Sequence, residues 1–185
     1  MNINEYQNYH ETKAHTSAEF PYNTYLCSIP LDFPGVPLHW HDELELVVIK
    51  RGQGFVSVDF DKRLVHSGDI IIIPPRCLHA IEQDDTFKME YENIIFKPDL
   101  LSSGANDLCM IQYIVPLLDG SLPIEYFLTP ALGSFEALSN CIRQIDLVCA
   151  DQTPGWQLAV KSSLFNFFFL LISERQKKTV STSSN

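Results

Sequence analysis

The stretch His39-Trp40-His41-Asp42-Glu43-Leu44-Glu45 decides the fold of this chain, together with His79 further along it. Two imidazoles, a carboxylate and a third imidazole supply the nitrogen and oxygen ligands that divalent transition metals accept. Odd-numbered positions share one face of an extended strand, so His39, His41 and Glu45 would point the same way. A straight strand, however, would hold His39 and Glu45 about 20 Å apart. We therefore expect the chain to reverse near Asp42-Glu43, so that a second strand brings Glu45 back beside the histidines.

Length and charge limit the classes of protein to which the chain can belong. Its 185 residues can form one sizeable core, or one main domain with a helical appendage. The formal net charge is -10, and the lysines and arginines are not bunched along most of the chain. Such a surface repels phosphate backbones, which argues against direct contact of these residues with DNA or RNA.

Three features bear on where the protein works. The N-terminus has neither a basic start nor an apolar run, so no signal peptide is visible. The most apolar run, Leu164 to Ile172, is far shorter than the roughly 20 residues of a membrane span and predicts a buried helix or an interface. No CxxC pair occurs among the five cysteines, which predicts reduced thiols. These are Cys27, Cys77, Cys109, Cys141 and Cys149. We expect a cytoplasmic protein with no membrane partner.

The first half of the chain has the pattern of a β protein. Residues 1–20 are polar and predict a loosely held arm. Short apolar or alternating runs then follow at regular spacing, which is typical of a sandwich or a small barrel. We expect strands at Tyr25–Ile29, Leu44–Ile49, Phe55–Phe60, Arg63–Val65, Ile70–Ile73, Leu78–Glu82 and Phe87–Phe96. The turns between them are expected at Arg51–Gly54, Asp61-Lys62 and Ser67–Asp69, and Leu44–Ile49 should be covered on both faces.

The remainder of the chain is helical in pattern. Two short helical patches are expected near residues 107–118. Ser134 then caps an amphipathic helix, and a longer helix runs from about Pro154 to Lys178. The last residues, 179–185, have the composition of a flexible linker. The long helix is apolar round much of its surface and needs cover on most sides, which predicts a homodimer. The residues expected to carry it are Leu138, Ile142, Ile145, Val160, Leu164, Phe168 and Leu171.

Two spaced motifs resemble those of the cupins. His39-x-His41-x3-Glu45-x6-Gly52 is similar to the first cupin motif, and Gly68-x5-Pro74-x4-His79 to the second. The chain departs from the pattern at Arg76, where glycine is usual, and at Gln83, where asparagine is common. The resemblance implies a double-stranded β-helix barrel in which His39, His41, Glu45 and His79 hold zinc, nickel, iron or manganese. The alternative is that these side chains are satisfied by hydrogen bonds, without a metal.

A second resemblance covers nearly the whole chain, to the sensor domains of AraC-family transcription regulators. The sequence stretches that look typical of that family are Leu38–Leu46, Ser67–Ile70, Glu92–Leu101 and Gly155–Leu164. The resemblance implies an arm at 1–20, a cupin barrel at 21–100 and a dimerising helical region at 101–178. It also implies that the arm closes over the mouth of the barrel. A pair of helix-turn-helix units would follow in that family, so DNA contact is expected only through such a domain, which this chain lacks.

The resemblance leaves two hypotheses for function. The first is the sensing and dimerisation domain of an AraC-type regulator, not an enzyme, which binds a small effector such as a sugar, with or without a metal. The second is a metal-dependent cupin enzyme of the dioxygenase, isomerase or decarboxylase type, because an open metal site can activate water or substrate oxygen.

Further residues are candidates for the ligand site besides the metal set. Phe55, Tyr91 and Asn93 lie in the expected strands and are either ligand contacts or core. Arg76, just before His79, is either a grip for carboxylates and sugar hydroxyls at the barrel mouth or a solvated loop residue. Cys77 could share a face with His79, which leaves a thiolate nucleophile as a further alternative.

Overall fold

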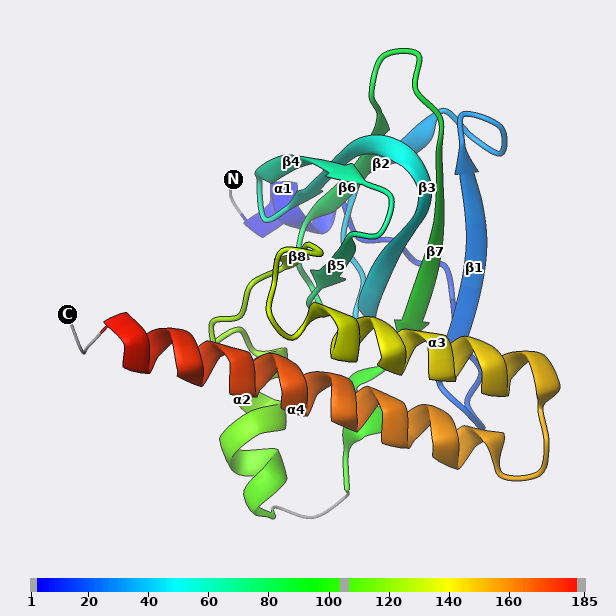
Figure 1. The fold of residues 1–185 in the computed structure, drawn as a ribbon. Helices are drawn as coiled ribbons and strands as arrows, with labels where there is room; N and C mark the ends of the chain where they lie inside the picture. The colour runs from blue at the N-terminus through cyan, green and yellow to red at the C-terminus, as the bar shows by residue number, and fades with distance from the viewer. Residues whose placement is uncertain (1–2, 104–106, 183–185) are drawn as a thin grey trace. The chain divides into compact units, whose positions relative to one another are not determined.

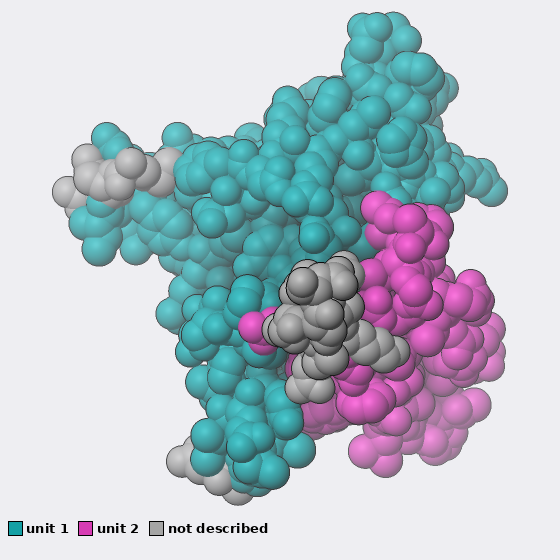
Figure 2. Space-filling model, turned by 60° about the vertical axis from the view of Figure 1, so that its left-hand side comes forward, with its two compact units in different colours: residues 1–128 teal, residues 129–185 magenta. Residues whose placement is uncertain are grey.

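The chain forms two compact units. The computed structural model describes residues 3–103 and 107–182, and it divides the chain into Met1–Leu128 and Thr129–Asn185 (Figure 2). The first unit contains all the strands and the second contains a pair of helices, so the predicted architecture, mainly β followed by α, is confirmed. The first unit runs beyond residue 100, the predicted end of the barrel, because it takes in a further strand.

Eight antiparallel strands build the first unit as two sheets that share one strand. The first sheet has the order β1-β7-β3-β5-β8, and in the second β6 lies between β2 and β3, with β4 on the other side of β3. The strand bounds in the first sheet are β1 Tyr22–Ile29, β7 Met89–Phe96, β3 Leu44–Val58, β5 Ile70–Ile73 and β8 Phe127–Leu128. In the second they are β2 Gly35–His39, β6 His79–Gln83 and β4 Asp61–His66.

The shared strand, β3, corrects the prediction of a turn at Arg51–Gly54. β3 is continuous over 15 residues and curves from the first sheet into the second (Figure 1). Its register with β7 shifts between Ile49 and Arg51, and Gly52 has a φ of +77°. A Cβ at Gly52 would stand 1.8 Å from the carbonyl oxygen of Lys88, so only glycine allows this approach. The glycines therefore mark a bulge and a bend, not a chain reversal.

The hairpin between β3 and β4 also differs from the prediction. Its two loop residues are Asp59 and Phe60, both with positive φ, and Val58 pairs with Asp61. Asp61-Lys62, the predicted turn, opens β4 instead. A two-residue loop with both φ values positive matches the right-handed twist of the flanking strands. Phe60 is a poor marker of such a turn, which is why its sequence signal was weak.

The core lies between the inner faces of the two sheets. Val47 and Ile49 face it from the first half of β3, and Val56 and Val58 from the second half. The predicted cover on both faces of Leu44–Ile49 is confirmed, because all six residues are buried. Inward positions are odd-numbered before the bulge and even-numbered after it, since the extra residue of a bulge reverses the alternation.

The N-terminal arm is held more firmly than its polar composition predicts. It begins with α1 (Ile3–Gln7) and then pairs with Trp40 through a parallel bridge at His10. The rings of Tyr6 and His10 stack on Trp40 with centroids 4.7 and 4.1 Å away. The indole Nε1 donates to the carbonyl oxygen of Tyr6 at 2.8 Å, and the N–H of Glu11 donates to that of Trp40 at 2.9 Å. One aromatic residue of the barrel thus anchors the arm.

Two features of the described residues between 98 and 128 differ from the prediction of two short helical patches. After a short 3-10 helix, Pro98–Leu101, the two expected helical patches form one continuous stretch. It includes a π-helical turn, Met110–Ile114, that runs into α2 (Val115–Leu118). The chain then returns to the first sheet as β8, which pairs with β5. A two-residue strand has too little periodicity to be read from sequence.

The second unit is a helical hairpin of α3 (Phe135–Asp151) and α4 (Trp156–Thr182), which pack side by side (Figure 1). Gln152, with a left-handed φ of 45°, ends α3. Ser134 precedes α3 as predicted, but its hydroxyl makes no capping hydrogen bond among the described residues. The linker was predicted at 179–185, but α4 continues to Thr182 because residues 179–182 contain neither Gly nor Pro. Residues 183–185 lie outside the described residues.

One stretch of α4, Trp156–Arg175, is apolar enough by length and composition alone to cross a membrane, with a mean hydropathy of 1.3. The shorter run counted in the sequence did not indicate this. Of the apolar window in this stretch, 28% is buried within the chain. The buried residues of α4 recur at three- and four-residue steps, at Val160, Leu164, Phe167, Phe168 and Leu171.

Candidate ligand and metal site

A cavity of about 240 Å³ opens between the two sheets of the first unit. Both sheets and the arm contribute to its wall, which mixes imidazoles and carboxylates with apolar side chains. It is lined by Glu11, Lys13, His15, Tyr25, Cys27, Phe33, Val36, His39, His41, Glu45, His79, Ile81, Tyr91, Asn93 and Ile95. A concave pocket with a few convergent polar groups is the usual form of a small-molecule site.

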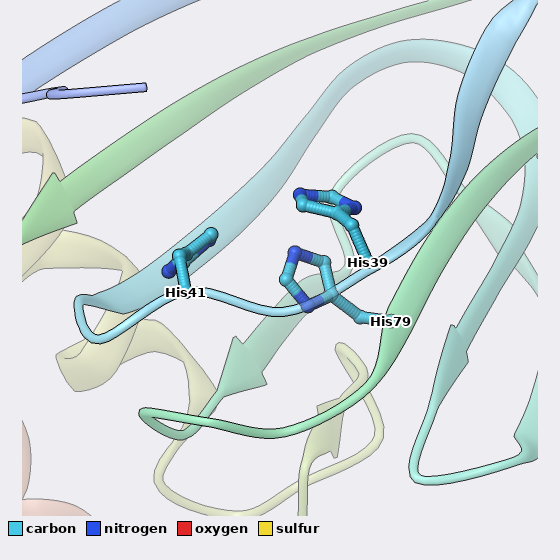
Figure 3. Close-up of side chains that lie close together, drawn as sticks. All are labelled: His39, His41 and His79. Carbon is cyan, nitrogen blue, oxygen red and sulfur yellow. The ribbon is translucent and has the colours of Figure 1, made fainter. Parts of the chain in front are cut away.

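Three imidazoles meet at this cavity. His39 on β2 and His79 on β6 are cross-strand partners, and their ring centroids are 4.1 Å apart. His41 follows β2, and the chain then turns back into β3, as the spacing predicted (Figure 3). The ligand nitrogens of His39, His41 and His79 all lie within 4.8 Å of one another. The strand pairing thus joins residues that stand far apart in sequence.

Glu45, the fourth predicted ligand, contacts two of the three imidazoles. Its Oε2 lies 3.0 Å from Nε2 of His41 and 3.5 Å from Nε2 of His79. Burial alone would raise the pKa of Glu45, but its contacts with His41 and His79 hold that pKa well below its usual range. Burial would lower the pKa of His41, yet Glu45 and Glu43 raise it. These shifts favour a charged imidazolium and carboxylate pair in the metal-free protein.

Backbone carbonyls fix the tautomers of the other two imidazoles. Nδ1 of His39 lies 2.9 Å from the oxygen of Pro37, and Nδ1 of His79 lies 2.9 Å from that of Cys77. Because a carbonyl only accepts hydrogen bonds, each Nδ1 carries a proton and each Nε2 of a neutral ring presents a lone pair. Burial and the neighbouring His79 lower the pKa of His39, which favours its neutral form. Metal-binding histidines in proteins are oriented in this way.

The donor set fits a divalent metal ion. Neighbouring ligands at bonds of roughly 2.1 Å stand about 3.0 to 3.4 Å apart, close to the two distances from Glu45. Nε2 of His79 is buried, lies 3.5 Å from the Glu45 carboxylate and makes no hydrogen bond within the described residues. An ion at this point would satisfy the buried nitrogen. The three imidazoles lie close enough together to hold an ion, and Glu45 stands beside two of them.

The structure brings two of the other predicted ligand residues to the cavity, Tyr91 and Asn93, both on β7. Burial raises the pKa of Tyr91, so its hydroxyl stays protonated. Oδ1 of Asn93 is buried and has no hydrogen-bond partner among the described residues. A ligand with hydroxyl or amino donors would satisfy this oxygen.

The structure leaves Phe55 and Arg76 outside the cavity, which corrects their prediction as ligand contacts. Phe55 follows the bulge in β3, so it points outward, where the ammonium of Lys62 lies 4.9 Å from its ring centre. Arg76 is 73% exposed, and its Nε donates to Oδ1 of Asp42 at 2.8 Å. Arg76 is therefore a solvated loop residue, which is the second of its two predicted interpretations.

Cys77 offers little support for thiolate chemistry. It does not line the cavity with His79, and burial raises its pKa to about 11. A thiol with this pKa remains protonated near neutral pH, whereas a nucleophilic cysteine needs the thiolate.

The arm contributes three cavity residues that the sequence reasoning missed: Glu11, Lys13 and His15. Tyr25 and Cys27 of β1 were missed as well. The Glu11-x3-His15 spacing, an acid and an imidazole in an otherwise polar arm, was the available signal. It was weak because nothing local indicates that the arm lies at the barrel.

All seven residues predicted to carry dimerisation are buried within the chain, at 4% exposure or less. They are Leu138, Ile142, Ile145, Val160, Leu164, Phe168 and Leu171. The apolar side chains that α4 exposes are others, Leu158, Phe165 and Phe169. An apolar stripe at helical spacing does not distinguish a core from an interface, which is why the prediction selected the buried face.

Comparisons with known proteins show the family of this chain. The model of a family described as the AraC-like ligand binding domain matches residues 31–168. The uncharacterized HTH-type transcriptional regulator YdeC of Bacillus subtilis (strain 168) is 32% identical over 159 residues, 85% of this chain and 54% of YdeC. YbfI, of the same description and organism, is 26% identical over 72 residues, 39% of this chain and 26% of YbfI. The chain thus spans about half the length of YdeC.

Among solved structures, a cupin protein from Bacteroides fragilis is similar to this chain. The alignment covers 50% of this chain and 75% of that protein, with 22% sequence identity and a TM-score of 0.39.

Proposed function

We propose, because the chain belongs to the family of AraC-like ligand-binding domains, that it is the effector-sensing domain of a transcription regulator. The observation that carries the proposal is the cavity between the two sheets, where polar groups from both sheets and the arm converge. DNA contact would belong to a further domain, as the names of the B. subtilis relatives suggest. A formal net charge of -10 supports this division, since these residues repel phosphate. A cytoplasmic location follows from the same role.

The cavity limits the effector in size and chemistry. About 240 Å³ is the volume that roughly eight water molecules occupy in the liquid, which suits a monosaccharide or a small sugar acid. Lys13 and the imidazoles can bind a carboxylate or hydroxyl oxygens, and Asn93 Oδ1 can accept a hydrogen bond from a hydroxyl. The apolar part of the wall, such as Ile81 and Ile95, would pack on carbon. We therefore propose a small polyhydroxylated metabolite.

A divalent metal, zinc, nickel, iron or manganese, is part of this proposal. His39, His41, His79 and Glu45 would hold it. A bound ion would supply an electrophilic anchor for a ligand oxygen. The chain's own residues fix the neutral tautomers of His39 and His79 through the carbonyl oxygens of Pro37 and Cys77.

Signal output would arise from differential affinity. A ligand that contacts the arm and the barrel together favours the state in which both are in place. A homodimer would transmit that change to the DNA-binding domains. Its interface would use the exposed stripe of α4, Leu158, Phe165 and Phe169, whose spacing of seven and four residues places them on one face.

The proposal is tested by thermal shift of the tag-free chain against sugars and sugar acids, with and without zinc. A ligand that raises the melting temperature of the wild type but not of Asn93→Leu supports binding in the cavity. Lys62→Leu, on the outer strands, is the control. Recovery of the ligand unchanged after incubation supports sensing, whereas conversion to a product supports the alternative, a metal-dependent cupin enzyme. Stabilisation of wild type and Asn93→Leu alike would place the ligand elsewhere.

A further inference from the structure

Glu11, in the arm, has a carboxylate at the edge of the imidazole cluster. Its backbone N–H is fixed by the carbonyl oxygen of Trp40 at 2.9 Å. Its Oε2 lies 3.4 Å from Nε2 of His39 and 3.0 Å from Nε2 of His15. Trp40 separates His39 from His41 in the sequence, so the residue that anchors the arm lies between two imidazoles of the site.

Glu11 places a carboxylate oxygen beside the imidazole of His39. Nδ1 of His39 lies 2.9 Å from the oxygen of Pro37, and Nε2 is the ring nitrogen that faces Glu11. Oε2 of Glu11 lies 3.4 Å from this nitrogen, and Oε2 of Glu45 lies 3.5 Å from Nε2 of His79. Two of the three imidazoles that could hold an ion thus have a carboxylate oxygen beside them.

We propose that Glu11 is a metal ligand carried by the arm, so that metal binding fastens the arm to the barrel. The proposal rests on the proposed function, in which the imidazoles hold a divalent ion. The distance of 3.4 Å between Glu11 Oε2 and His39 Nε2 lies in the range of about 3.0 to 3.4 Å that separates neighbouring ligands of one ion. Carboxylate oxygen beside imidazole nitrogen is a donor set that zinc and manganese accept.

His15 acts as a positioning residue for Glu11. Its side chain is only 9% exposed, and Nε2 donates to Glu11. Its backbone oxygen accepts a hydrogen bond from Nδ2 of Asn23 at 2.9 Å, which ties this part of the arm to β1. A hydrogen bond from a neighbouring residue to a metal-binding carboxylate orients that carboxylate toward the ion.

A ligand in the arm makes metal binding and arm docking reciprocal. An ion that binds Glu11 only when the arm is in place must favour the docked arm by the same factor by which docking favours the ion. The metal-free arm retains its stacking on Trp40 but lacks the cation between Glu11 and His39. Exchange of backbone amides in residues 8–15 should therefore slow when metal is added.

The first test measures zinc affinity of the tag-free chain by competition with a chromophoric chelator. We expect Glu11→Gln, which keeps the shape and removes the charge, to weaken zinc binding by about 10- to 100-fold. Glu11→Asp keeps the charge but shortens the side chain, and it should weaken binding to a similar extent. Glu19→Gln removes an exposed carboxylate of the same arm away from the cavity and should bind zinc as the wild type does. His79→Ala should lose zinc binding.

The second readout is hydrogen exchange of the arm with and without zinc. Zinc should protect residues 8–15 in the wild type and in Glu19→Gln, but not in Glu11→Gln or His79→Ala. Melting curves in chelator establish that each variant folds without metal.

The outcomes separate the two proposals. Wild-type zinc affinity in Glu11→Gln, with loss in His79→Ala, would overturn the role of Glu11 and leave the metal site in place. Full affinity in Glu11→Asp would show that charge, not coordination, is responsible, and would also overturn it. A wild type that binds no zinc, nickel, iron or manganese would overturn both proposals.

Discussion

Nε2 of His41 lies 3.0 Å from Oε2 of Glu45, and both side chains are at least nine-tenths buried. The two residues stand four positions apart on either side of the turn that leads from β2 into β3. The contact closes that turn and places an imidazole beside a carboxylate in the site. It shows that the turn brings Glu45 back beside the histidines, as the spacing predicted.

Replacing Glu45 with Gln should cost about 3 kcal/mol of unfolding free energy in metal-free buffer, because an imidazolium is left buried without its partner. Glu82→Gln is the matched control, since Glu82 pairs with Lys62 at the surface and should cost less than about 1 kcal/mol. Chemical denaturation with chelator present measures both. Equal losses in the two variants would contradict the buried pair.

The pH dependence of that difference follows from the directions of the two pKa shifts. The pKa of Glu45 is lowered in the folded state, so its contribution is complete above its unfolded pKa of about 4.3 and is lost at lower pH. The pKa of His41 is raised, so its contribution is complete below about 6.5 and is lost as pH rises through the folded value. The gap between wild type and Glu45→Gln should therefore be widest between about pH 4.3 and 6.5. A gap that grows steadily toward pH 9 would argue against these assignments.

Gly52→Ala should destabilise the chain by more than about 3 kcal/mol, because the new Cβ would meet the Lys88 oxygen at 1.8 Å in a backbone with positive φ. Gly120→Ala measures the cost of placing alanine at a positive φ without a steric clash. Gly120 has nearly the same φ, +76°, but a Cβ there meets nothing within 4 Å in the described chain, so the cost should be roughly 1 kcal/mol. Urea midpoints compare the two. Similar losses would mean that β3 does not bend tightly against the Lys88 segment.

Phe60→Gly should raise stability by about 1 kcal/mol, since Phe60 occupies a left-handed position of the β3–β4 hairpin and its ring is 64% exposed. Phe60→Ala removes the ring without relieving the backbone and serves as the control. Thermal melts should place only the glycine variant above the wild type. A higher melting temperature in both variants would show that removing the exposed ring, and not relieving the backbone, stabilises the chain.

Phe169→Glu should weaken self-association while leaving the fold intact, because Phe169 is 64% exposed on α4. Phe168→Ala, at a position 1% exposed, should instead cost about 3 to 5 kcal/mol of stability. Analytical ultracentrifugation across a concentration series, with melting curves, separates the two effects. If Phe169→Glu associates as tightly as the wild type, the exposed stripe of α4 is not the interface.

The candidate site divides into a part that could be predicted and a part that could not. His39, His41, Glu45 and His79 were found from spacing alone, and the cavity brings them together with Tyr91 and Asn93. Phe55 lies outside the cavity because the bulge between Ile49 and Arg51 reverses strand parity, and the glycines that mark this bulge also suit the turn that the sequence predicted there. The residues predicted to carry dimerisation are buried within the chain, and an apolar helix face is equally suited to core and interface.

The sequence by itself determined what depends on local periodicity: a sandwich or small barrel of short strands, the helices after it, and the turn that returns Glu45 to the histidines. These follow from alternation, helical steps and strand length, which each segment carries within itself. Only the tertiary structure decided which side chains share the cavity and that the arm is among them. Glu11 reaches His39 through the pairing of the arm with Trp40, a contact between segments far apart in the chain. Such contacts depend on packing and on the register of a bulged strand, and neither is encoded in any single stretch of residues.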